Sequence, residues 1–219
     1  MDINKQRTLK AAVHFDGIGL HTGEPVKLSI LPADENHGYK FQRTDLEGQP
    51  LIEADCDLVT STQRGTTLEQ NGAKVHTTEH VLSALYGCLV DNALIQVNGP
   101  EIPIMDGSAA SFVQALESTG YDEQNAKRKF LVLDENITFE DQEKQVEMLA
   151  VPTDGGEFRV TVMVDYNSPV LGTQHASMYQ LQDFIQDISK CRTFVFLKEI
   201  KQLAEHGLIK GGGLDNAIV

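Results

Sequence analysis

The sequence has few positively charged side chains. It holds 18 lysines and arginines against 32 aspartates and glutamates, which gives a formal net charge of −14. A chain this acidic repels phosphate backbones and anionic lipid surfaces, so nonspecific binding to nucleic acid or to a charged membrane is not expected. An anionic small molecule can still be a substrate, provided that a few basic residues gather at its site.

Long apolar runs and paired cysteines are also lacking. The first ten residues, MDINKQRTLK, contain no apolar run, so no signal peptide is predicted. No stretch approaches the roughly 20 apolar residues that a membrane-spanning helix needs. The cysteines are odd in number and form no CxxC pair, which predicts reduced thiols: Cys56, Cys88 and Cys191. These absences predict a cytoplasmic protein without stable membrane insertion.

The chain does contain enough apolar residues for a core. Hydrophobic residues make up 41% of its 219 residues, which is sufficient for one large domain or for two of about 100 residues. Residues 7–31 alternate and break at glycines, which predicts two strands joined by a glycine-rich turn. A dinucleotide-binding fingerprint would need its third glycine where Thr22 stands and a helix next. Because Pro25 and a strand pattern follow instead, dinucleotide binding is not favoured.

Short strands and two helices are predicted up to residue 120. Strands are expected at 38–43, on both sides of an Asn71-Gly72 hairpin turn, and at 91–98. Thr77 or Thr78 is a suitable N-cap for a helix that runs to Tyr86 and stops at Gly87. A second helix is capped by Ser108 and ends at Gly120.

The run YDEQNAKRKF, residues 121–130, is charged and aperiodic and separates two similar halves. It predicts a domain boundary, with domains at 1–125 and 128–219. The second half is expected to hold three strands within 128–166, a loop at 167–173, a helix at about 181–190 and another at 197–206.

The last five residues, DNAIV, repeat the pattern DNALI of residues 91–95, and each copy follows a helix and a glycine. The shared order of elements predicts an internal duplication. In the first half this strand leads on to a helix, whereas the second half stops on the strand. We therefore expect an incomplete second domain, whose sheet exposes apolar surface and favours association. A chain that simply ends on an edge strand is the alternative.

The stretch VHTTEHVL, residues 75–82, has three interpretations. In the first, HxxEH is an inverted zinc-protease motif with both histidines on one helix, which requires a helix already formed at His76. In the second, His80 alone binds a metal and Glu79 is the general base. In the third, His80 is a buried histidine at a helix start and binds no metal. The β-branched threonines disfavour the first, and the local residues alone leave the other two open.

Longer motifs carry a resemblance to a known family. GIGLHTGEPV, FQRTDLEG, TTEHVLSAL, PEIPIMDGSA, SKCRTFVFLKEI and GGGLDNAIV match, in this order, the UDP-3-O-acyl-N-acetylglucosamine deacetylases, zinc enzymes that act at the committed step of lipid A biosynthesis. The resemblance spans nearly the whole chain and favours the second interpretation. It implies an α+β fold of two similar domains, each a layer of helices against a sheet, with the active site between them.

The resemblance also implies roles for particular residues. His80 would be one zinc ligand, Glu79 the general base and Thr193 a contact of the oxyanion. The two other zinc ligands and the general acid of the family match no residue up to Val219. Phe194 and Phe196 match aromatic residues near the sugar and the uridine. The family's acyl passage matches seven positions: Leu20, Ile200, Ile209, Gly212, Leu214, Ala217 and Val219.

Two classes of function follow from the sequence. One is a zinc-dependent amide hydrolase that acts on a small UDP-sugar lipid, in some relatives fused to a dehydratase domain of fatty-acid synthesis. The other is a noncatalytic fragment or binding module, because two of three zinc ligands are missing from the 219 residues, so this fragment alone is expected to be inactive.

Overall fold

A computed structural model describes residues 3–153 and 156–219. Its central element is a five-stranded sheet of order β2-β3-β9-β4-β5, in which only β4 and β9 are parallel neighbours. The strands are β2 (Val13–Ile18), β3 (Pro25–Pro32), β4 (Tyr39–Arg43), β5 (Leu51–Glu53) and β9 (Ala93–Val97). In β3 the buried residues alternate with exposed ones, as a strand with one covered face requires.

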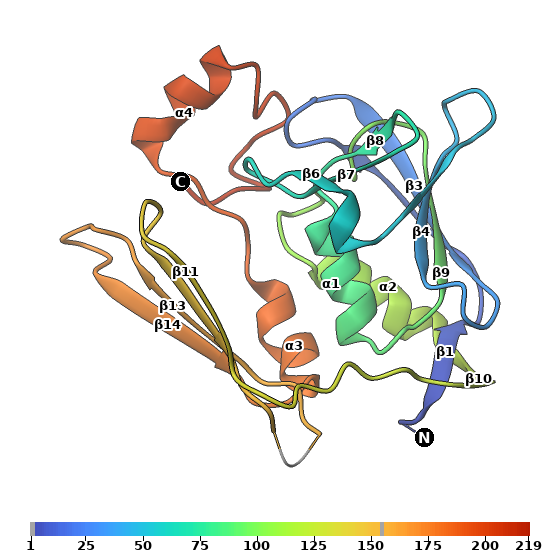
Figure 1. Ribbon diagram of the computed structural model, residues 1–219. Helices are drawn as coiled ribbons and strands as arrows, with labels where there is room; N and C mark the ends of the chain where they lie inside the picture. The colour runs from blue at the N-terminus through green and yellow to red at the C-terminus, as the bar shows by residue number, and fades with distance from the viewer. Residues whose placement is uncertain (1–2, 154–155) are drawn as a thin grey trace.

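Two helices cover one face of this sheet (Figure 1). They are α1 (Glu79–Gly87) and α2 (Ala110–Thr119). Their apolar sides meet the sheet in one core, where the rings of Phe15 and Phe112 lie 4.9 Å apart in an edge-to-face arrangement. Helices and strands thus form the α+β fold that the sequence predicts.

The helix ends differ in part from the prediction. Ala109 and not Ser108 is the N-cap of α2, although the Ser108 hydroxyl accepts a hydrogen bond from the Ala110 amide (3.1 Å). Gly120 ends α2 at φ 77°, as predicted. The Thr78 hydroxyl does not cap α1, because it donates to the Thr66 carbonyl instead (3.2 Å). Gly87 belongs to α1, and Leu89 takes the left-handed conformation after it (φ 56°).

A three-stranded sheet stands beside the central one and leads into α1 (Figure 1). It consists of β6 (Val59–Ser61), β7 (Thr67–Gln70) and β8 (Ala73–Val75), after a short 3-10 turn η1 (Cys56–Leu58). Asn71 and Gly72 have φ values of 52° and 79°, which is the left-handed pair of a type I′ hairpin turn. The predicted hairpin is confirmed.

The charged segment at 121–130 is a strand over most of its length. β10 (Tyr121–Lys127) pairs antiparallel with β1 (Lys5–Leu9), a strand that the charged and aperiodic sequence did not predict. The backbone of β10 forms hydrogen bonds with β1. This pairing does not require apolar and polar residues to alternate along the strand. The first of the two strands predicted within residues 7–31 is divided in the structure into β1 and β2. The domain limits at 125 and 128 stay predictions.

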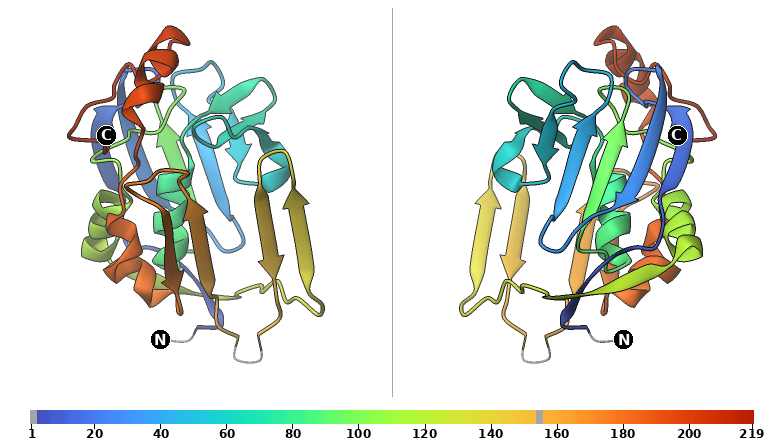
Figure 2. Two further views of the ribbon diagram at one scale, coloured as in Figure 1. Left: turned by 90° about the vertical axis from the view of Figure 1, so that its left-hand side faces the viewer. Right: turned by 90° about the vertical axis from the view of Figure 1, so that its right-hand side faces the viewer.

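The second half forms two separate antiparallel hairpins and two helices. The hairpins are β11 (Ile137–Asp141) with β12 (Val146–Ala150), and β13 (Val160–Asp165) with β14 (Thr173–Met178). β14 was not predicted. The helix expected at 181–190 is α3 (Gln182–Gln186) followed by the 3-10 turn η2 (Ile188–Lys190), and α4 spans Leu197–Glu205. Figure 1 shows both hairpins standing away from the central sheet, and Figure 2 shows the two hairpins beside each other.

The strand predicted at 215–219 does not form. Residues 214–216 are a turn, and one isolated bridge joins Phe194 to Ile218. The Asn216 side chain explains this, because it donates to the Gly211 carbonyl (2.9 Å) and accepts from the Gly213 amide (2.8 Å). Asn92 is buried in the same way, at 1% exposure against 2% for Asn216. The duplication itself remains a prediction. Within the described residues, no helix is both long and apolar enough to cross a membrane.

Candidate active site at the start of helix α1

The backbone before α1 decides how the two histidines of HTTEH lie. The His76 amide donates to the Pro100 carbonyl (2.8 Å), and Thr77 follows in the left-handed region at φ 58°. The helix begins only at Glu79. His76 is therefore not one helical turn from His80, and the inverted zinc-protease interpretation is wrong. Its ring pairs with the Thr67 hydroxyl (2.8 Å), and burial lowers its pKa while the Glu101 charge opposes this.

Glu79 and His80 are the first two residues of α1, and both are half-buried. One oxygen of Glu79 accepts a hydrogen bond from the Thr66 amide (2.9 Å), which fixes the direction of the carboxylate. Burial lowers the pKa of His80, and the charges of Glu79 and Asp106 act in the opposite direction. In residues 3–153 and 156–219, no hydrogen bond to the His80 ring is found. Its imidazole is thus available to a ligand.

Asp106 reaches this site from the turn that precedes α2. Its Oδ1 accepts hydrogen bonds from the Ser108 hydroxyl (2.7 Å) and the Ser108 amide (3.1 Å), and Ser108 is fully buried. These bonds hold the carboxylate in place. Asp106 was not among the predicted site residues, although PEIPIMDGSA, which contains it, was the most distinctive motif.

Thr193 lies against the same turn. Its amide donates to the Gly107 carbonyl (2.7 Å), and its own carbonyl accepts from the Ile218 amide (3.0 Å). Gly107 has φ 83°, and a Cβ on it would collide with the Asn216 carbonyl, so only glycine fits. Thr193 is half-buried, and its hydroxyl has no hydrogen-bond partner among the described residues. The second half of the chain is thereby brought next to Asp106 and, through it, to His80.

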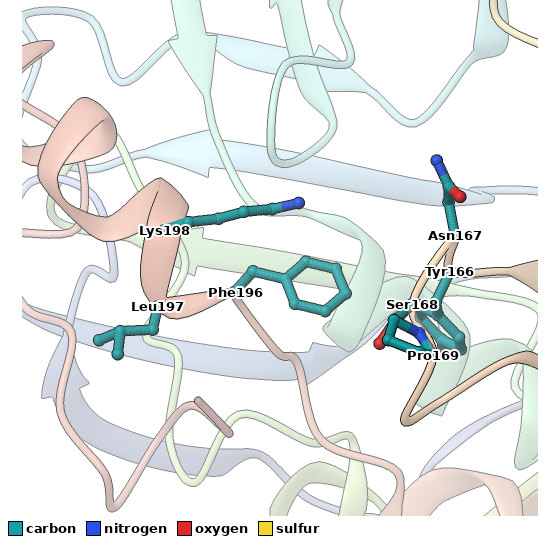
Figure 3. Close-up of a pocket in the computed structure, with 7 residues that line it drawn as sticks. All are labelled: Tyr166, Asn167, Ser168, Pro169, Phe196, Leu197 and Lys198. Carbon is teal, nitrogen blue, oxygen red and sulfur yellow. The ribbon is translucent and has the colours of Figure 1, made fainter.

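Phe194 and Phe196 take part in an aromatic cluster that the sequence revealed only in part. The Tyr166 ring lies 5.6 Å from the Phe194 ring and 6.2 Å from the Phe196 ring. Beside this cluster is a pocket of about 330 Å³, a size that suits a small molecule. Figure 3 shows Phe196 and Lys198 from the start of α4 facing residues from the loop at 166–169. Tyr166 and Lys198 were missed, and the only signal was the neighbouring loop at 167–173.

The seven residues of the expected acyl passage do not all meet. Leu20 is 8% exposed, and its carbonyl accepts from the Gly211 amide (3.0 Å). A Cβ on Gly212 would lie 3.8 Å from Leu20 and 3.1 Å from the Ile209 carbonyl, so these three residues are neighbours. Ile200 on α4 and Ala217 are half-buried. Leu214 is 79% exposed and Val219 53% exposed, so the structure places these two at the surface.

An ion pair joins the two halves near this region. Arg64, in the loop before β7, lies 3.0 Å from Glu199 on α4, and this contact lowers the pKa of Glu199. The Arg64 carbonyl also contacts the His21 ring (3.1 Å). This ion pair could not be predicted from the sequence, because Arg64 and Glu199 are far apart along the chain.

The donor chemistry around His80 fits one imidazole ligand of a zinc site. Across the described ranges, one group of three potential metal ligands lies close enough to share an ion, and it is formed by the exposed residues Asp55, Cys56 and Asp57. It does not include His80. The described residues therefore offer His80 as a single zinc ligand and not a complete three-ligand site.

Comparison with known proteins agrees with the motifs. A family model for UDP-3-O-acyl N-acetylglycosamine deacetylase matches residues 6–219. A protein of Chlorobaculum tepidum named "Bifunctional enzyme LpxC/FabZ" is 49% identical over 98% of this chain, which covers 46% of that protein. A "UDP-3-O-acyl-N-acetylglucosamine deacetylase" of Saccharophagus degradans is 43% identical over 98% of this chain and 71% of its own length.

The relatives named bifunctional are much longer than this chain. It spans about half the length of those from Chlorobaculum tepidum and from Bacteroides thetaiotaomicron, at 46% of each. It spans 68% of a deacetylase from Geotalea uraniireducens, with which it is 41% identical. Since the family model covers nearly all of the sequence, the chain belongs to the UDP-3-O-acyl N-acetylglycosamine deacetylase family.

Proposed function

We propose that the full-length protein is a cytoplasmic, zinc-dependent hydrolase that removes the N-acetyl group from a UDP-3-O-acyl-N-acetylglucosamine in lipid A biosynthesis. The observation that carries the proposal is the adjacent pair Glu79 and His80 at the start of α1, inside a family match over residues 6–219. Two of the relatives at 41% and 43% identity are named for this activity.

His80 would hold the zinc through its free imidazole, together with ligands from outside the described residues. When bound, zinc lowers the pKa of a water molecule and polarises the acetyl carbonyl. Asp106 would place a negative charge near His80, which favours a cation at that imidazole.

Glu79 would act as the general base. Its Oε2 is occupied by the Thr66 amide, so the carboxylate has a fixed direction and Oε1 remains to accept a proton from water. The proton would then pass to the amine that leaves as the amide bond breaks. Thr193 would donate its hydroxyl to the oxyanion of the tetrahedral intermediate, where a donor has its largest effect.

Substrate binding would draw on the two surfaces next to this centre. The aromatic pocket beside Phe194 and Phe196 offers stacking faces to the uridine, and Lys198 brings a positive charge for the diphosphate. Leu20, Ile209 and Gly212 would begin the passage for the acyl chain. Lys198 is the basic residue in the lining of the aromatic pocket.

Acetate release by the full-length, zinc-loaded protein tests the proposal. We expect turnover of UDP-3-O-acyl-N-acetylglucosamine, and we expect Glu79→Gln to lower kcat by about 10²- to 10⁴-fold, because a general base contributes that much. Glu53→Gln, which removes a surface carboxylate paired with Lys40, serves as the matched control. No acetate from the unmodified protein, or wild-type turnover by Glu79→Gln, would refute the assignment.

A further inference from the structure

Glu101 is the one buried acidic residue among those that the structure describes, with 1% of its surface exposed. It lies in the segment after β9, where its backbone forms an isolated parallel β-bridge with that of His76. A buried carboxylate is costly unless its charge is compensated by hydrogen bonds or by a partner ion. A carboxylate at this buried position therefore needs hydrogen-bond donors around both of its oxygens.

Four groups from two separate segments supply the hydrogen bonds. Oε1 accepts from the His21 amide (3.0 Å) and the Thr77 hydroxyl (2.9 Å). Oε2 accepts from the Thr22 amide (2.9 Å) and the Thr22 hydroxyl (2.8 Å). In the described part of the chain Glu101 has no salt bridge, so its charge is compensated by neutral donors alone.

The bond to Thr77 acts on the start of α1. Thr77 is β-branched and holds φ 58°, a conformation that costs energy and persists only where its surroundings enforce it. It is 2% exposed and stands two residues before Glu79. The Glu101 bond thus fixes the turn from which Glu79 and His80 project.

The bonds to His21 and Thr22 act on the loop at 19–23. A Cβ on Gly19 would collide with the Glu101 carboxylate, so the loop can close over this residue only with glycine there. The carbonyls of Leu20 and His21 in turn accept hydrogen bonds from the amides of Gly211 (3.0 Å) and Lys210 (3.4 Å). Glu101 therefore holds the loop side of the contact between Leu20 and the 209–212 segment.

We propose that Glu101 is a positioning residue that couples the loop of Leu20 to the Glu79–His80 pair, so that one buried carboxylate sets the catalytic pair relative to the acyl passage. This inference rests on the proposed deacetylase function. Because the Thr77 hydroxyl and the Thr22 hydroxyl are separate donors to Glu101, each of these bonds can be removed without the other. Loss of the Thr77 bond should lower zinc affinity and kcat. Loss of the Thr22 hydroxyl bond should raise KM and weaken the preference among acyl chain lengths.

The test compares variants of nearly equal shape in the full-length protein. Thr77→Val and Thr22→Val remove a hydroxyl, whereas Thr77→Ser and Thr22→Ser keep it. We expect Thr77→Val to lower kcat and zinc affinity by about tenfold or more, since small displacements of catalytic groups cost up to about a hundredfold. Thr77→Ser should recover most of this loss. Zinc affinity is measured by titration of the apoprotein, independently of turnover.

The loop is tested on two substrates that differ only in acyl length. Thr22→Val should raise KM for the longer substrate by about tenfold, with kcat nearly unchanged. A tenfold change in KM corresponds to the loss of about one hydrogen bond to a charged group. Glu101→Gln should combine both effects, and Glu53→Gln should show neither.

Several results would overturn the inference while leaving the deacetylase function intact. One is acetate release and zinc affinity in Thr77→Val equal to those in Thr77→Ser. Another is a change in Thr22→Val that affects kcat and KM for both substrates alike. If Glu101→Gln does not fold, the comparison of the Val and Ser variants at Thr77 and at Thr22 still tests the inference. Absence of turnover in the unmodified protein would instead refute the proposed function itself.

Discussion

The two halves of the chain contain similar strands but bury them very differently. In the described residues, every buried hydrophobic side chain except Met178 lies between Leu9 and Leu116. In the second half, all residues of β12 and β13 are exposed. Phe139, Met148 and Met163 are 56%, 63% and 74% exposed.

The difference shows that a strand pattern becomes a core only where another layer covers it. In the first half, α1 and α2 lie on the central sheet, and Phe112 and Leu85 are fully buried between them. The hairpins β11–β12 and β13–β14 keep their apolar faces open. The exposed apolar surface predicted for the second half is confirmed. An exposed surface of this kind favours association.

Two phenylalanines give the sharpest contrast. We expect Phe112→Ala to lower the free energy of unfolding by about 3–5 kcal/mol, because it opens a cavity in a packed core. Phe139→Ala should change it by less than about 0.5 kcal/mol, as is usual for exposed positions. Urea unfolding followed by circular dichroism measures both. Equal losses would show that the hairpins are as well packed as the central sheet.

Charge on the hairpins should change association rather than stability. Met148→Lys and Met163→Lys place a charge on the exposed apolar faces, and we expect them to shift the 219-residue chain toward a monomer in sedimentation. Leu46→Lys, in a loop of the first half at 36% exposure, is the control. The same sedimentation profile in all three variants would mean that these faces do not drive association.

A change of pH should have a smaller effect on stability, through His76 in the packed first half. Burial lowers the pKa of His76 in the folded state below its ordinary value of 6.5. The unfolded state then binds more protons, so the stabilisation is present above pH 6.5 and is lost as the pH falls through the folded pKa.

We therefore expect His76→Gln to reduce the loss of stability between about pH 7 and pH 5. His175→Gln, on the exposed strand β14, is the control. Urea midpoints at both values of pH give the comparison. An unchanged pH dependence in His76→Gln would contradict the assignment.

Local chemistry was sufficient to predict much of the first half. The Asn71-Gly72 turn and the end of α2 at Gly120 depend on conformations that one or two residues prefer by themselves. The helix start after HTT was also correct, because β-branched threonines disfavour the helix. These features need no knowledge of distant partners.

Features that depend on distant partners were missed. β10 is a strand because β1 pairs with it, and residues 214–216 form a turn because the Asn216 side chain binds Gly211 and Gly213. The same reason applies to the site. Glu101, in the motif PEIPIM, meets Thr22 and Thr77 only after folding, and Tyr166 meets Phe194 only when the second half folds. No spacing along the sequence reports such contacts.

The most direct test of the account is the zinc content of two histidine variants of the full-length protein. Because α1 begins after His76, only His80 projects from the helix beside Glu79. We therefore expect purified His80→Ala to retain little zinc, whereas His76→Ala retains nearly as much as the unmodified protein. Metal analysis of the dialysed proteins gives the answer. Equal zinc in both variants, whether lost or kept, would contradict the placement of the metal centre at His80.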